Sequence, residues 1–195
     1  RAAPEMKGQS LSGQVSTSKS YRIHGENGHV GKVAVLDLGI KKSTLEHLAM
    51  RGLEIEVFPA DISAAEILAT SPDGFFFSNG PGDPEASGNQ VSMLRELLAT
   101  KKPFFGICFG NQLLGRALGF DTYKLKFGHR GINQPVINNE TGRVEVTAHN
   151  HGFAVKLESD SAESPLGFGQ VKVSHRGLND QVVEGLECVD IPAFS

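Results

Sequence analysis

The chain has 195 residues, a formal net charge of −3 and 39% hydrophobic residues. This length is sufficient for a substantial core, and the mildly acidic, interspersed charges give no reason to expect nucleic acid or an anionic membrane as a partner. No apolar run approaches the roughly 20 residues that a membrane span needs. Two cysteines cannot form a disulfide framework for a domain of this size, so we expect a reducing, cytoplasmic setting.

Residues 1–31 have weak periodicity, and Ser, Lys and Gly are frequent among them. The chain begins with Arg1, without an initiator methionine and without the charged-then-apolar pattern of a signal peptide. We interpret this segment as a connector, with room for one short ordered stretch, that enters a domain starting at Lys32. The chain is therefore expected to be a piece of a longer protein.

From Lys32 onward, apolar strands alternate with single helices. The pattern predicts strands at 33–38, 55–57, 75–77 and 104–107, and helices at 43–51, from 63, at 89–100 and at 111–118. Ser63 opens the second helix as its N-cap, and Glu66 completes a capping box. Strands separated by single helices predict a doubly wound, mostly parallel α/β sheet of the flavodoxin-like type, with helices on both faces. Ligands of such sheets bind outside the carboxyl ends of the strands.

After Gly119 the pattern changes to short strands joined by turns. We expect strands at 123–127, 136–137, 144–147, 171–174 and 182–186, with a turn at 139–142. This pattern predicts an added antiparallel portion that completes or flanks the main sheet.

Cys108 lies between Gly106 and Gly110, where the strand at 104–107 ends and the helix at 111–118 begins. A sharp strand-to-helix turn at a nucleophile needs small neighbours, because the bend brings backbone segments close together. The turn also places the thiol at a helix N-terminus, which favours a thiolate. We interpret Cys108 as a nucleophile, although an inert buried cysteine is the common alternative in apolar surroundings.

The loop at 78–84 contains two glycines and two prolines in seven residues. Such a loop is stiff and still reaches unusual backbone angles, so its N–H groups can stabilise an oxyanion without reorganising. Taken alone, the loop fits a plain strand-to-helix turn slightly better than an oxyanion-binding role. It lacks the pattern of a nucleotide phosphate cradle. Like Cys108, it follows the carboxyl end of a predicted strand.

Together, these two loops resemble those of the class I (triad) glutamine amidotransferases, whose signature is a Gly-Pro-Gly loop and a Gly-x-Cys-x-Gly-x-Gln elbow. Two further stretches are similar to the small, glutaminase subunit of carbamoyl-phosphate synthase. They are Lys-Phe-Gly-His-Arg-Gly at 126–131 and Thr-Ala-His-Asn-His-Gly-Phe-Ala-Val at 147–155. The similarity runs from about residue 6 to residue 195 and so covers nearly the whole chain.

The resemblance implies a role for each matching residue. Cys108 would attack the side-chain amide of glutamine, release ammonia and leave a thioester for water to cleave. The backbone N–H of Phe109 would form the oxyanion hole with that of Gly80 or Gly82. The positions that match the family's glutamine-binding residues are Gly80, Gly82, Phe109, Gln112, Asn150, Gly152 and Phe153. On the residues alone, Gln112 equally fits a solvated first helical turn, and Asn150 and Phe153 an ordinary turn.

The resemblance also implies partners and a domain organisation. Residues 1–31 would be a linker and the tail of an N-terminal domain, and residues 32–195 an amidotransferase domain that lacks its C-terminal end. The substrate would be L-glutamine, and ammonia would pass to a large synthetase subunit that uses ATP, Mg²⁺ and bicarbonate for pyrimidine and arginine synthesis. No cofactor is expected in this chain. Two alternatives stay open: the glutaminase subunit of another synthase, such as anthranilate synthase, and a non-catalytic glutamine-binding or regulatory module.

The sequence departs from the family pattern in three places. Asn111 replaces the usual histidine and Phe109 the usual leucine, with modest expected effects because the backbone N–H donates in either case. The His-Pro-Glu motif that completes the family's triad after a segment like residues 191–195 does not occur in the sequence. The catalytic histidine and glutamate of the triad are therefore missing, and we expect this chain to turn over slowly.

The seven histidines do not supply an obvious substitute for that base. His149 and His151 lie near the glutamine-binding stretch but do not match the family's base, and His129 matches the family's interface region. The other four are expected at the surface: His24, His29, His47 and His175. No set of His and Cys has metal-ligand spacing along the chain, so no metal site is expected. Cys188 is interpreted as a structural strand position.

Overall fold

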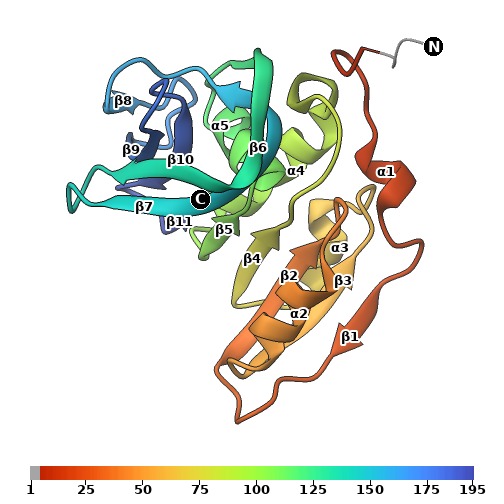
Figure 1. The fold of residues 1–195 in the computed structure, drawn as a ribbon. Coiled ribbons are helices and arrows are strands. Elements are labelled where there is room, and N and C mark those ends of the chain that lie inside the picture. Colours follow the sequence, from red (N-terminus) through yellow and green to blue (C-terminus); the bar gives the residue numbers. More distant parts are fainter. Residues whose placement is uncertain (1–4) are drawn as a thin grey trace.

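The computed structural model describes residues 5–195, and its strands form a single sheet (Figure 1). Five neighbouring strands are parallel. In spatial order they are β3 (Leu53–Phe58), β2 (Gly31–Leu36), β4 (Gly74–Phe77), β5 (Phe104–Gly106) and β11 (Ala193–Phe194). The first of these strands along the chain, β2, lies between the second and the third, which is the flavodoxin-like order of a doubly wound sheet. The predicted fold class is confirmed.

Helices cover both faces of the parallel strands. They are α1 (Ser12–Val15), α2 (Lys42–Ala49), α3 (Ala64–Ala69), the 3₁₀ helix η1 (Pro84–Ala86), α4 (Gly88–Ala99) and α5 (Phe109–Ala117). Successive side chains of β2 point to opposite faces, so Val35 packs in a cluster with Leu45 of α2. Leu36 packs instead in the larger cluster that includes Leu94 of α4 and Leu113 of α5. Because both faces are covered, β2, β4 and β5 are largely apolar, whereas Glu54 and Glu56 interrupt the apolar residues of β3.

The capping box predicted at the start of α3 is present. The Ser63 hydroxyl accepts a hydrogen bond from the Glu66 backbone N–H at 3.2 Å. In return, the Glu66 carboxylate accepts one from the Ser63 backbone N–H at 3.1 Å. Two helix N–H groups that would otherwise lack partners are thereby satisfied.

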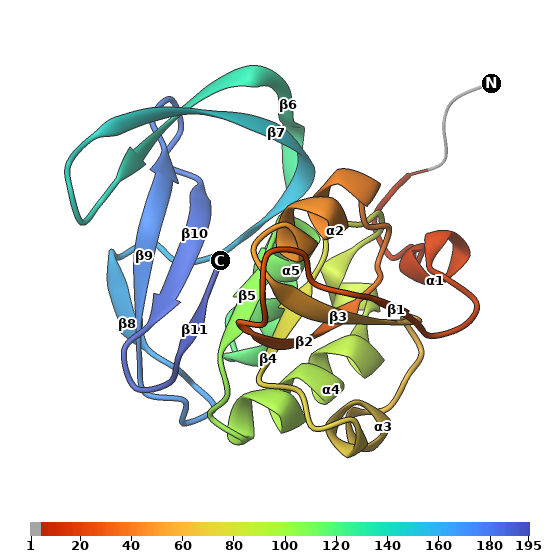
Figure 2. The ribbon, with the colours of Figure 1, turned by 90° about the horizontal axis from the view of Figure 1, so that it is seen from below.

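The second half of the sheet is antiparallel and lies beside the α/β half (Figure 2). Its strands are β6 (Thr122–Asn138), β7 (Val144–Val155), β8 (Ser161–Glu163), β9 (Gln170–Gly177) and β10 (Val183–Cys188). The sequence predicted two short strands at 123–127 and 136–137, but these are the two ends of the one long strand β6. The pairing of β6 with β7 is irregular between Lys124 and His129 and between Gly131 and Gln134. The residues of this middle part are mostly polar, so the sequence does not show a strand pattern there. The predicted turn at 139–142 joins β6 to β7.

Two short strands tie the ends of the described chain into the sheet. β1 (Tyr21–Ile23) pairs antiparallel with β3 at the outer edge, so the segment interpreted as a connector contributes an edge strand. β11 lies in the middle of the sheet, parallel to β5 and antiparallel to β10. Over residues 5–195, no helix is long and apolar enough to cross a membrane.

Candidate active site

Cys108 adopts a strained backbone conformation between β5 and α5. Its φ is 56° and its ψ −99°, outside the regions that non-glycine residues usually occupy. A Cβ on Gly106 would lie 2.7 Å from the backbone carbon of Gly110, and a Cβ on Gly110 would overlap the Phe77 carbonyl oxygen. Both glycines are therefore required by close backbone approach, and the predicted strand-to-helix elbow at Cys108 is formed.

The residues predicted to bind glutamine gather around one cavity of about 790 Å³. It is lined by the loop after β4, by the elbow after β5 and by one stretch of β7. The predicted residues in its wall are Gly80, Gly82, Cys108, Gln112, Asn150, Gly152 and Phe153. Phe109 is buried instead, and its backbone N–H donates a hydrogen bond to the Cys108 sulfur. The fold thus brings all of these residues together, while the role of each stays a prediction.

The loop after β4 is held rigidly against the loop after β2. Gly80 lies so close to the Leu38 carbonyl oxygen that there is no space for a Cβ. The Asn79 side-chain amide donates to the Gly39 carbonyl at 2.9 Å. Gly82 has a φ of +121°, which disfavours any other residue. A loop fixed in this way keeps its N–H groups in place during a reaction.

Gln112 is buried rather than solvated, with an exposed fraction of 4%. Its side-chain N–H donates to the Phe153 carbonyl at 2.7 Å and so ties α5 to β7. On the same strand, the Asn150 carbonyl oxygen lies 3.9 Å from the Cys108 sulfur. Gln112 therefore positions the strand that forms one wall of the cavity.

The Cys108 thiol has a raised pKa. Burial is the largest cause and outweighs the Phe109 N–H and the Lys41 charge, which lower the pKa, while the Glu184 charge raises it further. The N–H group at the helix terminus thus lowers the pKa of Cys108, as expected, but desolvation of the sulfur outweighs it. A nucleophilic Cys108 needs a group that accepts its proton. Cys188 is a buried position of β10, as expected, and burial raises its pKa to about 12.

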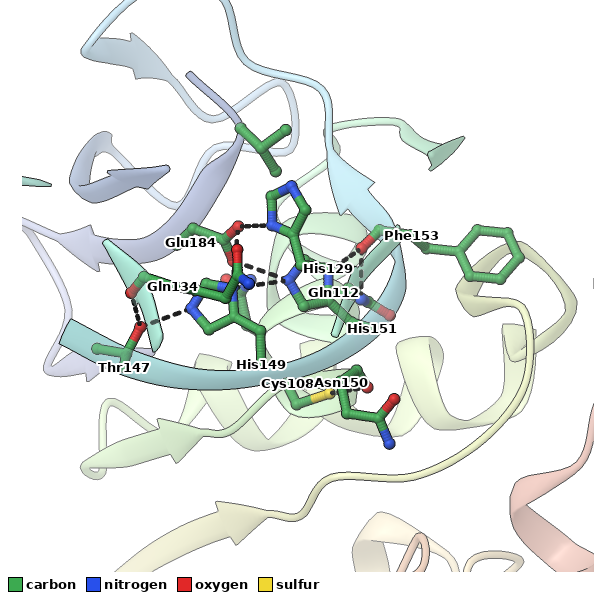
Figure 3. Close-up of polar contacts among 12 residues, drawn as sticks. Cys108, Gln112, His129, Gln134, Thr147, His149, Asn150, His151, Phe153 and Glu184 are labelled. Atoms are coloured by element: carbon green, nitrogen blue, oxygen red, sulfur yellow. Dashed lines mark hydrogen bonds and ion pairs between the residues drawn. The ribbon is translucent and has the colours of Figure 1, made fainter. Parts of the chain in front are cut away.

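A cluster of histidines that the sequence patterns did not reveal lies beside the cavity (Figure 3). His129 of β6 pairs in register with His151 of β7, and His149 lies two residues earlier on β7. The Glu184 carboxylate of β10 contacts His129 Nδ1 at 2.7 Å and His151 Nε2 at 3.1 Å. The expectation of no metal-ligand set rested on spacing along the chain, whereas the pairing of β6, β7 and β10 brings these residues together. The one available signal was the two-residue spacing of His149 and His151, which puts both on the same face of a strand.

The pKa values of the two histidines of β7, which both lie near the Glu184 carboxylate, are shifted in opposite directions. Burial lowers the pKa of His149, although the Glu184 charge opposes it. Burial also acts against a charged His151, but the hydrogen bond and charge of Glu184 outweigh it and raise the pKa. Of the four histidines expected at the surface, three are exposed, whereas His175 is half-buried and contacts the Ser174 hydroxyl at 3.0 Å.

The doubly wound sheet, the cysteine elbow and the rigid Gly-Pro-Gly loop together define a class of protein. Residues 34–195 match the family described as Glutamine amidotransferase class-I, and the chain belongs to this family. Over its whole length it is 56% identical to the carbamoyl phosphate synthase small chain of Streptomyces avermitilis, covering 51% of that protein. It is 57% identical to the small chain of Bifidobacterium longum, where 98% of this chain aligns with 49% of the relative. The chain thus spans about half the length of these relatives.

Solved structures give the same fold at lower identity. A GMP synthase subunit protein from Thermoplasma acidophilum is similar with a TM-score of 0.67 and 20% identity, covering 86% of this chain and 83% of that one. A glutamine amidotransferase from Thermotoga maritima has a TM-score of 0.61 and 15% identity, covering 85% and 74%. At these identities the likeness concerns the fold alone.

Proposed function

We propose that this chain is the glutaminase part of a carbamoyl-phosphate synthase small chain and that it hydrolyses L-glutamine to glutamate and ammonia. The observation that carries the proposal is the strained Cys108 elbow, which opens onto the same cavity as the rigid Gly80–Gly82 loop and the Asn150–Phe153 stretch. The names of the curated relatives support the same activity.

In the proposed reaction, the Cys108 sulfur forms a bond to the amide carbon of glutamine, and the carbonyl oxygen becomes an oxyanion. The backbone N–H of Phe109 and that of Gly80 or Gly82 donate hydrogen bonds to this oxyanion. The carbon–nitrogen bond then breaks, and the amide nitrogen takes up the proton lost by the thiol and leaves as ammonia. Water hydrolyses the thioester, which releases glutamate and restores the Cys108 thiol. Gln112, Asn150, Gly152 and Phe153 hold the α-amino and α-carboxylate groups, for which amide and backbone groups offer both donors and acceptors.

The reaction is limited by removal of the proton from the Cys108 thiol. Within residues 5–195, the polar groups found at the Cys108 sulfur are the Asn150 carbonyl oxygen and the Phe109 N–H, and neither of them is a base. Because burial also raises the pKa of Cys108, the thiolate is scarce at neutral pH. We propose that these residues alone bind glutamine and turn it over slowly, and that a histidine–glutamate pair like that of the family's His-Pro-Glu motif is needed for full activity.

The proposal extends to the surroundings of the domain. Residues 1–31 would be the linker and tail of an N-terminal domain, and residues 32–195 the amidotransferase domain. Ammonia would pass to a large synthetase subunit that supplies the ATP and Mg²⁺ chemistry, with no cofactor in this chain. The site of action would be the cytoplasm, and the product would serve pyrimidine and arginine synthesis.

A diazo-ketone analogue of glutamine tests the proposed site. We expect it to alkylate Cys108, with protection by glutamine, and we expect no labelling of Cys108→Ser. A Cys188→Ser variant is the matched control and should be labelled like the wild type. Absence of labelling in an intact-length protein that carries the histidine–glutamate pair would instead favour a non-catalytic binding module.

Two further measurements test turnover and partner. Steady-state ammonia release by the chain alone should be far below that of an intact synthase, and comparable release would contradict the proposed need for an additional base. The chain should co-purify with the large subunit of carbamoyl-phosphate synthase. Co-purification with an anthranilate synthase subunit would instead assign it to another synthase.

A further inference from the structure

Three imidazoles and one carboxylate converge on the face of β7 that points away from Cys108 (Figure 3). The ligand atoms of His129, His149, His151 and Glu184 all lie within 4.8 Å of one another. His151 Nε2 is 3.4 Å from His149 Nδ1 and 3.1 Å from Glu184 Oε2. The ligand atoms of a tetrahedral ion with bonds of about 2.0–2.1 Å are about 3.3 Å apart. The distance from His129 Nδ1 to Glu184 Oε1 is shorter, 2.7 Å, so one ion of this size can be held after small movements of the side chains.

The hydrogen bonds on the outer side of the cluster fix which ring nitrogens carry protons. His151 Nδ1 faces the Phe153 carbonyl at 3.0 Å, and a carbonyl only accepts, so this nitrogen is protonated. His149 Nε2 faces the Thr147 hydroxyl at 2.7 Å, and that hydroxyl donates its own proton to the Gln134 carbonyl. His149 Nε2 therefore carries a proton and donates it to the Thr147 hydroxyl oxygen. In the neutral rings, the lone pairs of His151 Nε2 and His149 Nδ1 then point at each other, and either a proton on His151 Nε2 or a metal cation between the rings relieves this repulsion.

His129 and two carboxylates complete the arrangement. His129 Nδ1 faces Glu184, while His129 Nε2 contacts the Asp180 carboxylate at 2.7 Å. An outer carboxylate that orients a histidine in this way is a common feature of metal sites. In the described part of the chain, the ion-pair partners of both carboxylates are histidines. Their two negative charges equal the charge of one divalent cation.

We propose that His129, His149, His151 and Glu184 form a binding site for one Zn²⁺ ion. Imidazole and carboxylate ligands in a tetrahedral arrangement suit Zn²⁺, whereas Mg²⁺ and Ca²⁺ prefer oxygen ligands alone. The four side chains expose only 9–15% of their surface, as is suitable for a closed, structural site. The ion joins β6, β7 and β10, and so fixes β7 on the side opposite to Cys108. His149 and His151 also border the cavity of Cys108, but the metal site does not rest on the proposed glutaminase activity.

Zinc titration and nuclear magnetic resonance test the site directly. The wild-type chain, first treated with a chelator, should bind one equivalent of Zn²⁺ in a calorimetric titration at neutral pH. In ¹⁵N spectra of the imidazoles, zinc should shift Nδ1 of His129, Nδ1 of His149 and Nε2 of His151, and leave the other four histidines unchanged. Shifts at other histidines, or binding well below one equivalent, would overturn the proposal.

Matched variants distinguish these ligands from other zinc-binding groups. Glu184→Gln keeps the shape but loses the charge, and should weaken Zn²⁺ at least about 100-fold. Asp180→Asn removes only the outer carboxylate and should weaken it about 10- to 100-fold. His47→Gln, at an exposed position, should bind like the wild type. Equal weakening by His47→Gln and Glu184→Gln would contradict the assignment.

Cobalt identifies the ligand atoms even if a variant fails to fold. Co²⁺ added to the wild-type chain should give the visible bands of a four-coordinate ion, without the charge-transfer band of a thiolate. Cys108→Ser should give the same spectrum. A thiolate band that disappears in Cys108→Ser would place the metal on the elbow instead and overturn the proposal.

Discussion

At the scale of single residues, the site depends on how closely the backbone packs around Cys108. Its positive φ stores strain on the order of 1–3 kcal/mol, and such strain persists only where the surroundings impose it. Two close backbone approaches impose the strain here. Gly106 lies against the backbone of Gly110, and Gly110 lies against the Phe77 carbonyl. The elbow therefore exists because these two glycines have no side chains.

Gly110→Ala should be destabilising, because the new methyl group overlaps the Phe77 carbonyl oxygen. We expect the free energy of unfolding in urea to fall by about 1–3 kcal/mol. Gly88→Ala is the control, since Gly88 begins α4 with open space around it. That variant should be neutral or up to about 1 kcal/mol more stable. Equal losses in both variants would contradict the steric explanation.

Alkylation of Cys108 by iodoacetamide should report its raised pKa. In buffer with a chelator, the rate should keep rising above pH 9.0, the ordinary value, because the thiolate forms only at higher pH. Glu184→Gln removes a negative charge that raises this pKa, so its midpoint should lie lower. Mass spectrometry of the Cys108 peptide measures the rate, with a short unstructured cysteine peptide as reference. A wild-type midpoint below that of the peptide would be inconsistent with the structure.

At the scale of elements, local side-chain contacts determine where helices begin and how the antiparallel strands are joined. Ser63 and Glu66 define the start of α3 through their reciprocal hydrogen bonds. Arg176, buried on β9, connects that strand to the segment between β7 and β8. The capping box can be predicted from the sequence, whereas the contacts of Arg176 depend on the tertiary structure.

Ser63→Ala should cost about 1 kcal/mol of unfolding free energy, the usual effect of losing an N-cap. The contribution of Glu66 depends on pH, because its hydrogen bonds from Ser63 lower its pKa below the ordinary 4.5. Stabilisation by a lowered carboxyl pKa is complete above the unfolded value and is lost as pH falls through the folded value. The stability difference between wild type and Ser63→Ala should therefore shrink as pH is lowered below about 4.5 in urea titrations. A difference that is constant from pH 7 to pH 3 would argue against this contact.

Arg176→Met should lower the unfolding free energy by about 3 kcal/mol, because several carbonyl groups lose their donor. The Arg176 guanidinium donates to the carbonyls of residues 157–159 and of Gln181, and to the Asp160 carboxylate at 2.8 Å. Arg176→Lys should recover less than half of the loss, since an ammonium cannot reproduce the planar fork. Arg51→Met, at an exposed position, should change stability by less than about 0.5 kcal/mol. Full recovery by lysine would show that charge alone matters.

Sequence patterns predicted those features that depend on local chemistry. Four of the five parallel strands are mainly apolar, and the glycines around Cys108 are spaced for an elbow, so both could be predicted. β11 was missed, because a strand of two residues has no pattern of its own. The continuity of β6 could not be predicted, because its middle at 126–134 is largely polar and its pairing passes through two irregularities. The cluster around Glu184 also escaped prediction, since it depends on the register between β6 and β7 and on the position of β10.

At the scale of the whole molecule, β11 joins the two halves of the sheet. Ala193 pairs with Phe104 of the parallel half, and Phe194 pairs with Glu187 of the antiparallel half. The Phe194 ring also stacks on Phe105, with centroids 4.8 Å apart. The backbone of residues 192–195 thus connects β5 to β10, with hydrogen bonds from the Phe104 amide to the Pro192 carbonyl and from the Ser195 amide to the Leu186 carbonyl.

Deletion of residues 192–195, which removes the Pro192 carbonyl that accepts from the Phe104 amide, should separate the two halves more than loss of the Phe194 side chain does. In the deletion variant, we expect amide protons of β5 and β10 to exchange at least about 10-fold faster, because their ladder partner is gone. Phe194→Ala keeps that ladder and loses only the ring contact, worth about 0.5–1.5 kcal/mol. Hydrogen exchange measured by mass spectrometry compares the two variants. Similar exchange in both would show that the ring, rather than the backbone, holds the halves together.

The position of β11 also has a consequence for synthesis of the protein. While the chain is still being made, β5 has already left the ribosome, but the strand that pairs with its free edge has not. An unpaired strand edge is a template for pairing with other chains. Until residues 192–194 emerge, the nascent chain therefore exposes the edge next to Phe104, whose amide finally bonds to the Pro192 carbonyl. Closure of the sheet is thus a late event in synthesis, and until then the open edge can pair with other chains.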